Sequence, residues 1–246
     1  MLNKVPQITL IFWVIKILAT TVGETAADFL KTRMGLGMGG TSLAMSALFL
    51  IVLAVQLTRR QYIPAVYWTA VVLVSVVGTL ISDNLVDNLG IPLWVTTIVF
   101  ACALAVVFIA WWSSERTLSV HSIRTTKRES FYWAAILFTF ALGTSAGDFL
   151  AEASGLGYGL SALTFAGLIA LTAVAYYAFK INGVLAFWIA YILTRPLGAS
   201  LGDLLSQPHE NGGLGMGTTT TSALFLTVIV ALVAYLTVTR KDFVPE

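Results

Sequence analysis

Apolar residues fill eight long stretches of the chain, and short polar segments separate them. The stretches run over residues 7–29, 40–57, 63–83, 92–112, 130–150, 158–179, 183–204 and 217–238. Each is close to the length of about 20 residues that a helix needs to cross a bilayer. None shows the polar–apolar alternation of membrane strands, and helices satisfy their own backbone groups in lipid. The pattern predicts an all-α integral membrane protein with eight transmembrane helices.

Composition narrows the class of protein further. Of 246 residues, 58% are hydrophobic and 11% are charged, and the mean hydropathy is +0.88. Soluble domains carry about 25% charged residues. These values exclude a disordered chain, a nucleic-acid-binding protein and an ordinary soluble enzyme. The single cysteine, Cys102, excludes an internal disulfide framework. We therefore expect the lipid bilayer as a partner and no nucleic acid.

The basic residues predict an orientation. The N-terminus and every second loop hold ten of them: Lys4, Arg59, Arg60, Arg116, Arg124, Lys127, Arg128, Lys180, Arg240 and Lys241. The opposite loops hold only Lys31 and Arg33. The positive-inside rule then places both termini in the cytoplasm. The basic loop 113–129 would be cytoplasmic and would divide the chain into halves, 1–112 and 130–246.

One sequence pattern, aromatic-Trp-x9-Gly-x4-Asp-x-Leu, occurs four times without a gap. Its first and second copies are offset by 55 residues, as are its third and fourth. The copies are Phe12-Trp13, Gly23, Asp28, Leu30; Tyr67-Trp68, Gly78, Asp83, Leu85; Tyr132-Trp133, Gly143, Asp148, Leu150; and Phe187-Trp188, Gly198, Asp203, Leu205. A fixed period of this length indicates tandem structural repeats.

Each repeat predicts a helical hairpin, and the four hairpins cover 7–57, 63–112, 130–179 and 183–238. After each Asp comes a glycine-containing turn, and the second helix is entered through a hydroxyl residue: Thr41, Thr96, Ser161 or Thr219. Two spans per repeat give all four hairpins one orientation, so we expect a pseudo-symmetry axis along the membrane normal. The four Trp residues are typical of interface anchors.

The repeated Gly-x4-Asp-x-Leu hairpins, four in eight spans, resemble a bacterial membrane-protein family built from a repeat of unknown function (domain of unknown function 347). The resemblance covers nearly the whole chain. It implies the repeat architecture and a location in the bacterial inner membrane, and it implies no activity.

The four repeated carboxylates allow two interpretations. Asp28, Asp83, Asp148 and Asp203 each follow their Trp by fifteen residues, about 22 Å along a helix. Four carboxylates at one depth would form an acidic ring that binds hard cations such as Mg²⁺, Ca²⁺ or Mn²⁺. Alternatively, each Asp bonds to the adjoining turn and holds its own hairpin together.

Three charged residues inside the spans, Lys16, Glu24 and Arg195, occur in one repeat only. Lys16, Glu24 and Asp28 lie on one face of the first helix, at intervals of four residues that also include Thr20. Arg195 lies within the seventh span, next to Pro196. Because an arginine in the bilayer needs a partner, we expect Arg195 to meet Glu24 or one of the Asp residues. The pair is either a structural ion pair or a group that couples transport to proton or metal binding.

Three functions stay open at this stage. The first is a proton-coupled transporter of a small cation, a divalent metal such as Mn²⁺. Its metal ligands would be Glu24 and the four Asp residues, and its coupling groups would be Arg195 and Lys16. The four hydroxyl residues would line the path. The second is a channel-like pore with the same acidic ring, and the third is a scaffold without transport. No catalytic motif indicates an enzyme, and no cofactor is expected. Assembly into a homo-oligomer stays open.

Overall fold

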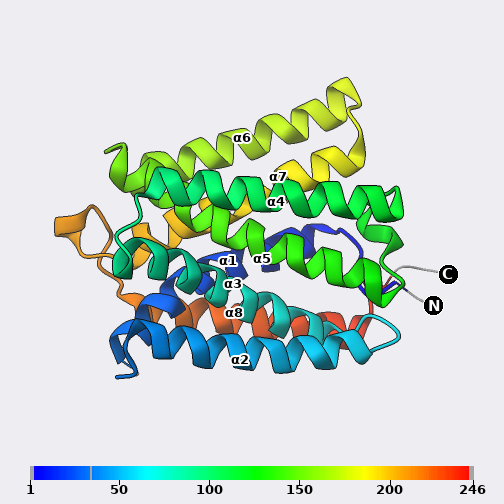
Figure 1. The fold of residues 1–246 in the computed structure, drawn as a ribbon, viewed down its shortest axis with the longest axis horizontal. Coiled ribbons are helices and arrows are strands. Elements are labelled where there is room, and N and C mark those ends of the chain that lie inside the picture. The colour runs from blue at the N-terminus through cyan, green and yellow to red at the C-terminus, as the bar shows by residue number, and fades with distance from the viewer. Residues whose placement is uncertain (1–2, 34, 244–246) are drawn as a thin grey trace.

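The eight predicted helices are present in the computed structural model, which describes residues 3–33 and 35–243. All eight are long and apolar enough to cross a membrane, and the two ends of the chain lie at the same end of the bundle (Figure 1). The helices are α1 (Leu10–Arg33), α2 (Gly37–Thr58), α3 (Pro64–Asp83), α4 (Leu93–Glu115), α5 (Thr126–Asp148), α6 (Tyr158–Phe179), α7 (Gly183–Ser206) and α8 (Thr218–Thr239).

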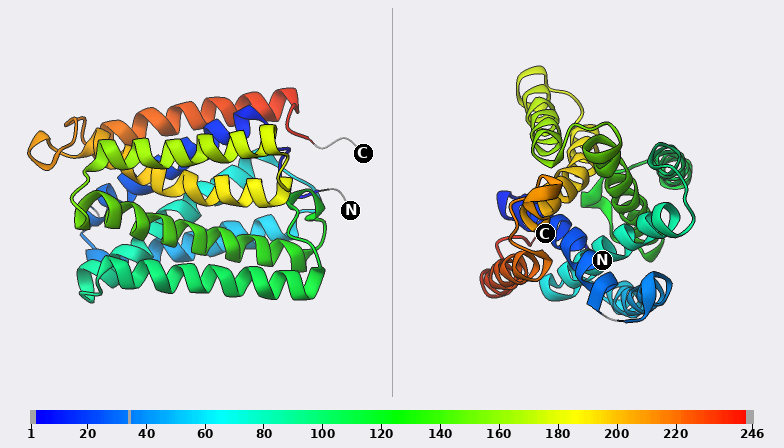
Figure 2. Two further views of the ribbon diagram at one scale, coloured as in Figure 1. Left: turned by 90° about the horizontal axis from the view of Figure 1, so that it is seen from above. Right: turned by 90° about the vertical axis from the view of Figure 1, so that its left-hand side faces the viewer.

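The odd-numbered helices form an inner ring, and the even-numbered helices lie outside it. Helix α1 packs on α3, α3 on α5, α5 on α7, and α7 closes the ring against α1. The most apolar windows of these four helices are 56–72% buried, against 11–22% in α2, α4, α6 and α8. The end-on view of Figure 2 shows the outer helices at the periphery. Side chains of the outer helices are therefore the ones that face lipid.

Each outer helix packs on the inner helix of the next repeat, and not on that of its own repeat. Helix α2 packs mainly on α3, α4 on α5, α6 on α7, and α8 on α1, whereas α1 and α2 contact each other little. The two helices of a predicted hairpin are therefore neighbours in sequence, but the outer helix packs most closely on the inner helix of the next repeat. This offset makes each repeat depend on its neighbour for burial.

The repeated glycine lies where two inner helices cross. A Cβ at any of the four glycines would overlap with the following inner helix, so only glycine lets the backbones approach this closely. The contact recurs at the same position in each repeat: Gly23 lies on Ser75, Gly78 on Phe140, Gly143 on Arg195 and Gly198 on Thr20.

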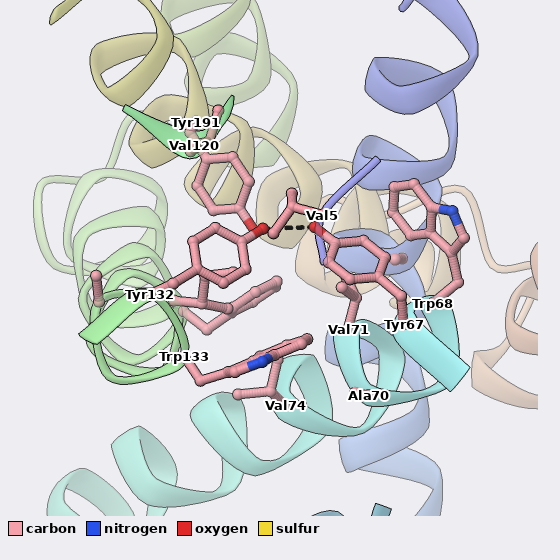
Figure 3. Packing of buried hydrophobic residues seen from close by; sticks show 14 of the residues in the cluster. Val5, Tyr67, Trp68, Ala70, Val71, Val74, Val120, Tyr132, Trp133 and Tyr191 are labelled. Carbon is pink, nitrogen blue, oxygen red and sulfur yellow. Dashed lines mark hydrogen bonds between the residues drawn. The ribbon is translucent and has the colours of Figure 1, made fainter. Parts of the chain in front are cut away.

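The aromatic-Trp pairs also join neighbouring repeats. Ring centroids are 5.5 Å apart for Phe12–Trp68, 5.6 Å for Tyr67–Trp133, 6.3 Å for Tyr132–Trp188 and 5.7 Å for Phe187–Trp13. Trp68, Trp133 and Trp188 are at most 4% exposed, and Figure 3 shows the first two within the apolar core. The expectation that these Trp residues anchor the membrane interface was wrong for these three, because each one packs inside the ring.

Turns between the helices use glycine in left-handed conformations. Gly35, Gly90 and Gly155 have φ values of 65°, 66° and 74°, as a turn directly after the inner helix requires. A single π-helical turn follows Asp83 (Asn84–Asn88) and another follows Asp148 (Phe149–Ala153). Such turns are rare and occur frequently at functional sites.

The N-terminal segment closes the end of the ring at which both termini lie. Val5 is 2% exposed and lies beside the hydroxyl groups of Tyr67 and Tyr132, which are 2.5 Å apart (Figure 3). Lys4 is buried and pairs with buried Glu129 at 2.6 Å. The backbone of the segment also bonds to three other connections, through Tyr62, Ile123 and Asp242. This segment therefore links the ends of several repeats.

Candidate functional site

Arg195 lies in the middle of the inner ring and is fully buried. The Arg195 side chain packs against Gly143 of α5, where any larger residue would overlap with it. Helix α7 continues without a break through the next residue, Pro196. The Arg195 guanidinium donates to all three other inner helices: to the Thr20 carbonyl at 2.5 Å, the Phe140 carbonyl at 3.3 Å, Glu24 Oε2 at 3.1 Å, Thr144 Oγ1 at 2.7 Å, and Thr79 Oγ1.

The pairing of Arg195 with Glu24 confirms the ion pair expected from the sequence. Glu24 is 4% exposed and also accepts a hydrogen bond from Thr79 Oγ1 at 3.3 Å. An arginine away from water is costly unless its charge and its donors are matched. Here one carboxylate balances the charge, while hydroxyl and carbonyl oxygens accept from the remaining donors. Thr79 and Thr144 occupy the positions equivalent to Glu24 in their repeats, and sequence reasoning did not identify them as partners.

Lys16 lies two helical turns before Glu24 on α1 and is fully buried. Its Nζ has no hydrogen-bond partner among the described residues. Instead it lies 4.1 Å from the ring centre of Phe140 and 4.2 Å from that of Tyr191. Two aromatic faces stabilise a desolvated ammonium through cation–π attraction. Lys16 and Arg195 therefore share Phe140 as a neighbour, since Arg195 also lies over that ring at 5.3 Å.

Two of the repeated carboxylates are joined by a lysine. Lys31 Nζ is 2.8 Å from Asp28 Oδ1 and 2.7 Å from Asp83 Oδ2. The three side chains are only 10–20% exposed. The sequence-based count assigned Lys31 to a loop. Its spacing of three residues from Asp28 on one helix was the signal that would have identified the pair.

Asp148 and Asp203 have no such partner. Among the side chains that the structure describes, which exclude that of Arg33, neither carboxylate makes an ion pair or a side-chain hydrogen bond. Asp203 is 6% exposed. The segment of α7 that carries Asp203 lies against Glu24, because a Cβ at Gly202 would be 3.1 Å from the Cβ of Glu24.

The structure does not assemble the predicted carboxylates into a metal centre. Across the described part of the chain, no three His, Cys, Asp or Glu side chains lie close enough together to hold one metal ion. Asp28 and Asp83 have Lys31 between them, and Glu24 is occupied by Arg195. A chelating site made of these groups would require them to move.

Two of the four predicted path-lining hydroxyls bond to carbonyl groups of their own helices. Thr41 donates to the Gly37 carbonyl and Thr96 to the Leu93 carbonyl, while the buried Ser161 hydroxyl has no partner among the residues described. Thr219 is exposed, so its equivalence with Thr41 was wrong.

The buried counterpart is Thr221, which donates to the Gly217 carbonyl as Thr41 does to Gly37. The loop before α8 is therefore five residues longer than its counterparts. The equivalence of Thr219 with Thr41 had implied a loop longer by only three residues.

Fold and site together define a multi-pass helical membrane protein built from four tandem repeats. The chain belongs to the family defined by the Repeat of Unknown Function (DUF347), whose model matches residues 11–62, 66–117, 131–182 and 186–242. Each match contains one inner helix and the outer helix that follows it. No curated protein and no solved structure matches the chain significantly.

Proposed function

We propose that this protein is a membrane transporter for a small cation, and that the cation passes among the carboxylates inside the inner ring. The observation that carries the proposal is the charge inside these four helices. These helices carry five carboxyl groups (Glu24 and the four repeated Asp residues) and three basic groups (Lys16, Lys31 and Arg195). Ionisable residues are costly within a membrane and are functional suspects by default. Carboxyl groups outnumber the basic groups, and carboxylate oxygens are ligands for cations and not for anions.

Arg195 and Glu24 would couple the movement. Asp148 and Asp203 are the carboxylates without an ion pair among the described side chains, and α7 packs on Glu24 one residue before Asp203. A cation or proton that binds to Asp148 or Asp203 changes the charge that Glu24 and Arg195 experience. Release of Glu24 from Arg195 would then supply a third ligand. A divalent metal such as Mn²⁺ requires this rearrangement, because oxygen-only sites for such ions use several carboxylates.

The orientation that fits this function has all four repeats parallel around an axis along the membrane normal. Both chain ends lie at one end of the bundle, where the ten basic residues of the sequence also gather. We place this end in the cytoplasm and the protein in a bacterial inner membrane. The carboxylates then lie towards the outer side. In this assignment the protein is a transporter and not an enzyme.

A non-transporting scaffold is the second candidate, and one observation favours it. The N-terminal segment closes one end of the ring with buried, fully bonded groups such as Lys4 and Glu129. The same closure argues against a permanently open channel. A transporter must open this end during its cycle, whereas a scaffold never needs to.

Flux measurements separate these functions. Purified protein in liposomes would be tested with fluorescent indicators for H⁺, Na⁺, K⁺ and Mn²⁺, with empty liposomes for comparison. We expect flux of one cation by the wild type and loss of this flux in Glu24→Gln, with unchanged insertion. Glu210→Gln, at an exposed acid in the loop before α8, is the matched control and should keep its flux. Absence of flux for every cation with the wild type would contradict transport and favour the scaffold.

A further inference from the structure

A groove of about 810 Å³ runs along the side of the bundle between α1, α6 and α7. This volume falls within the range of about 300–1,000 Å³ of ligand-binding sites. Most of its wall is apolar, with Trp13, Ile17, Ile169, Tyr176 and Phe187 among the lining residues. It is separate from the charged groups of the inner ring.

The groove exists because α6 stands away from α1. Helix α6 packs on α7 and on the π-helical turn Phe149–Ala153, whereas α8 packs on both α1 and α3. Figure 2 shows α6 projecting from the bundle in the end-on view. Tyr177 lines the groove and is itself 70% exposed, and the face of α6 turned away from the groove exposes Leu171 (63%). The groove is therefore continuous with a surface that faces lipid.

The depth of the groove matches one leaflet of a bilayer. Its lining residues on α7 extend from Gly183 to Thr194, and those on α6 from Tyr177 to Ile169. At 1.5 Å per residue these distances are about 16 Å and about 12 Å. Half of a hydrocarbon core about 30 Å thick is about 15 Å. One acyl chain that lies parallel to the helices would fill this length.

The polarity of the groove also matches a lipid. Its polar lining residues at the end near the chain termini are Gln7, Ser119, His121 and Asn182, and none of them is acidic. Exposed Lys180 lies two residues before Asn182, and exposed Arg116 and Arg124 flank the loop that contributes Ser119 and His121. Basic groups at the level of the headgroups attract anionic lipids.

We propose that this groove binds one phospholipid with an anionic headgroup, with an acyl chain along α7 and the headgroup among the basic residues near Asn182. The site requires only that the protein spans a membrane, so it does not depend on cation transport. Its deep end is Thr194, whose carbonyl accepts a hydrogen bond from Thr20 Oγ1 at 3.3 Å. Thr194 precedes Arg195, so the bound chain supports the α1–α7 contact that holds Arg195.

The test compares lipids and matched variants. Delipidated protein in detergent would receive phosphatidylglycerol or phosphatidylcholine, and native mass spectrometry would count the retained lipids. Ala173→Trp fills the groove from α6, and Ala105→Trp places the same side chain on the exposed face of α4. We expect one retained phosphatidylglycerol in the wild type and in Ala105→Trp, and at least a tenfold lower occupancy in Ala173→Trp.

Equal retention by Ala173→Trp and the wild type would overturn the site, and equal retention of phosphatidylcholine would overturn the anionic headgroup. A second measurement on the wild type covers a failure of Ala173→Trp to fold. Phosphatidylglycerol with a photoreactive acyl chain should crosslink to the groove residues of α6 and α7, for example Tyr176. Crosslinks confined to α2, α4 and α8 would contradict the proposal.

Discussion

Arg195 Nη2 lies 3.1 Å from Glu24 Oε2, and this contact joins the last repeat of the sequence to the first. It forms where α7 meets α1 and closes the inner ring. Both side chains are buried, and the same guanidinium reaches α3 and α5 through Thr79 and Thr144. One side chain therefore connects all four inner helices. A substitution of Arg195 should change both the stability of the protein and any movement of these helices relative to one another.

Removal of Arg195 alone should destabilise the protein more than replacement of both Arg195 and Glu24. Arg195→Met leaves Glu24 buried without a counter-charge, and the loss of one partner of a buried pair costs about 3–5 kcal/mol. Replacement of both partners by apolar residues avoids this penalty. We therefore expect the double variant Glu24→Met/Arg195→Met to unfold at higher denaturant concentration than Arg195→Met alone. Equal or lower stability of the double variant would show that Arg195 acts mainly through its other hydrogen bonds.

The repeated glycines should be intolerant of a single added methyl group. A Cβ at Gly78 would overlap with Phe140 and its backbone, so α3 and α5 would have to separate. Forcing extra volume into a packed contact costs about 1–3 kcal/mol. Gly167→Ala is the matched control, because nothing lies within 4 Å of its Cβ position on α6. Thermal unfolding in micelles should show a lower midpoint for Gly78→Ala, while the control keeps or exceeds the wild-type value.

Much of the architecture was predictable because the membrane and the repeat both impose regular spacings. The eight apolar stretches gave the eight helices, and the repeat gave matching positions for Gly23, Gly78, Gly143 and Gly198. The packing of each outer helix on the next repeat was not predictable. The short loops permit either neighbour, and which one is buried depends on contacts between residues far apart in sequence.

The sequence predicted a contact within the site only where an unpaired charge inside the membrane would be too costly. Arg195 needed an acidic partner inside the spans, so the sequence limited the partner to Glu24 or one of the Asp residues, and the structure identifies it as Glu24. The bridge from Lys31 to Asp83 did not follow from the sequence, because it depends on how α1 and α3 are rotated. The hydroxyl of Thr219 was misplaced because the extra loop residues before α8 shift the register by two positions.

The stability of the protein should fall with rising pH through Asp242, which lies outside the spans. Burial raises the pKa of the Asp242 carboxyl, although a hydrogen bond from Tyr62 at 2.5 Å opposes this shift. The folded chain thus holds the proton more tightly than the unfolded chain. Stability from this group is complete below the unfolded pKa of about 3.9 and is lost as pH rises through the raised folded value.

Asp242→Asn stays neutral and keeps an oxygen that accepts from Tyr62, so its thermal midpoint should exceed that of the wild type increasingly from pH 4 to pH 8. Asp87→Asn, at an exposed position on the other end of the bundle, should follow the wild-type profile. Parallel profiles for Asp242→Asn and the wild type would show that the carboxyl of Asp242 is not the group responsible.

Lys31 should act as a built-in competitor for the transported cation, because its ammonium lies between Asp28 and Asp83 at 2.8 Å and 2.7 Å. A cation that uses these carboxylates must displace the ammonium, or must bind beside it against charge repulsion. Lys31→Met removes this competitor and keeps most of the side-chain volume. We expect a lower apparent KM for flux in liposomes, by about tenfold for each 1.4 kcal/mol of competition removed.

Arg59→Met removes an equal charge from an exposed position at the other end of the bundle and should leave KM unchanged. If Lys31→Met transports with the wild-type KM, the cation does not use Asp28 and Asp83. The path would then be restricted to Glu24, Asp148 and Asp203.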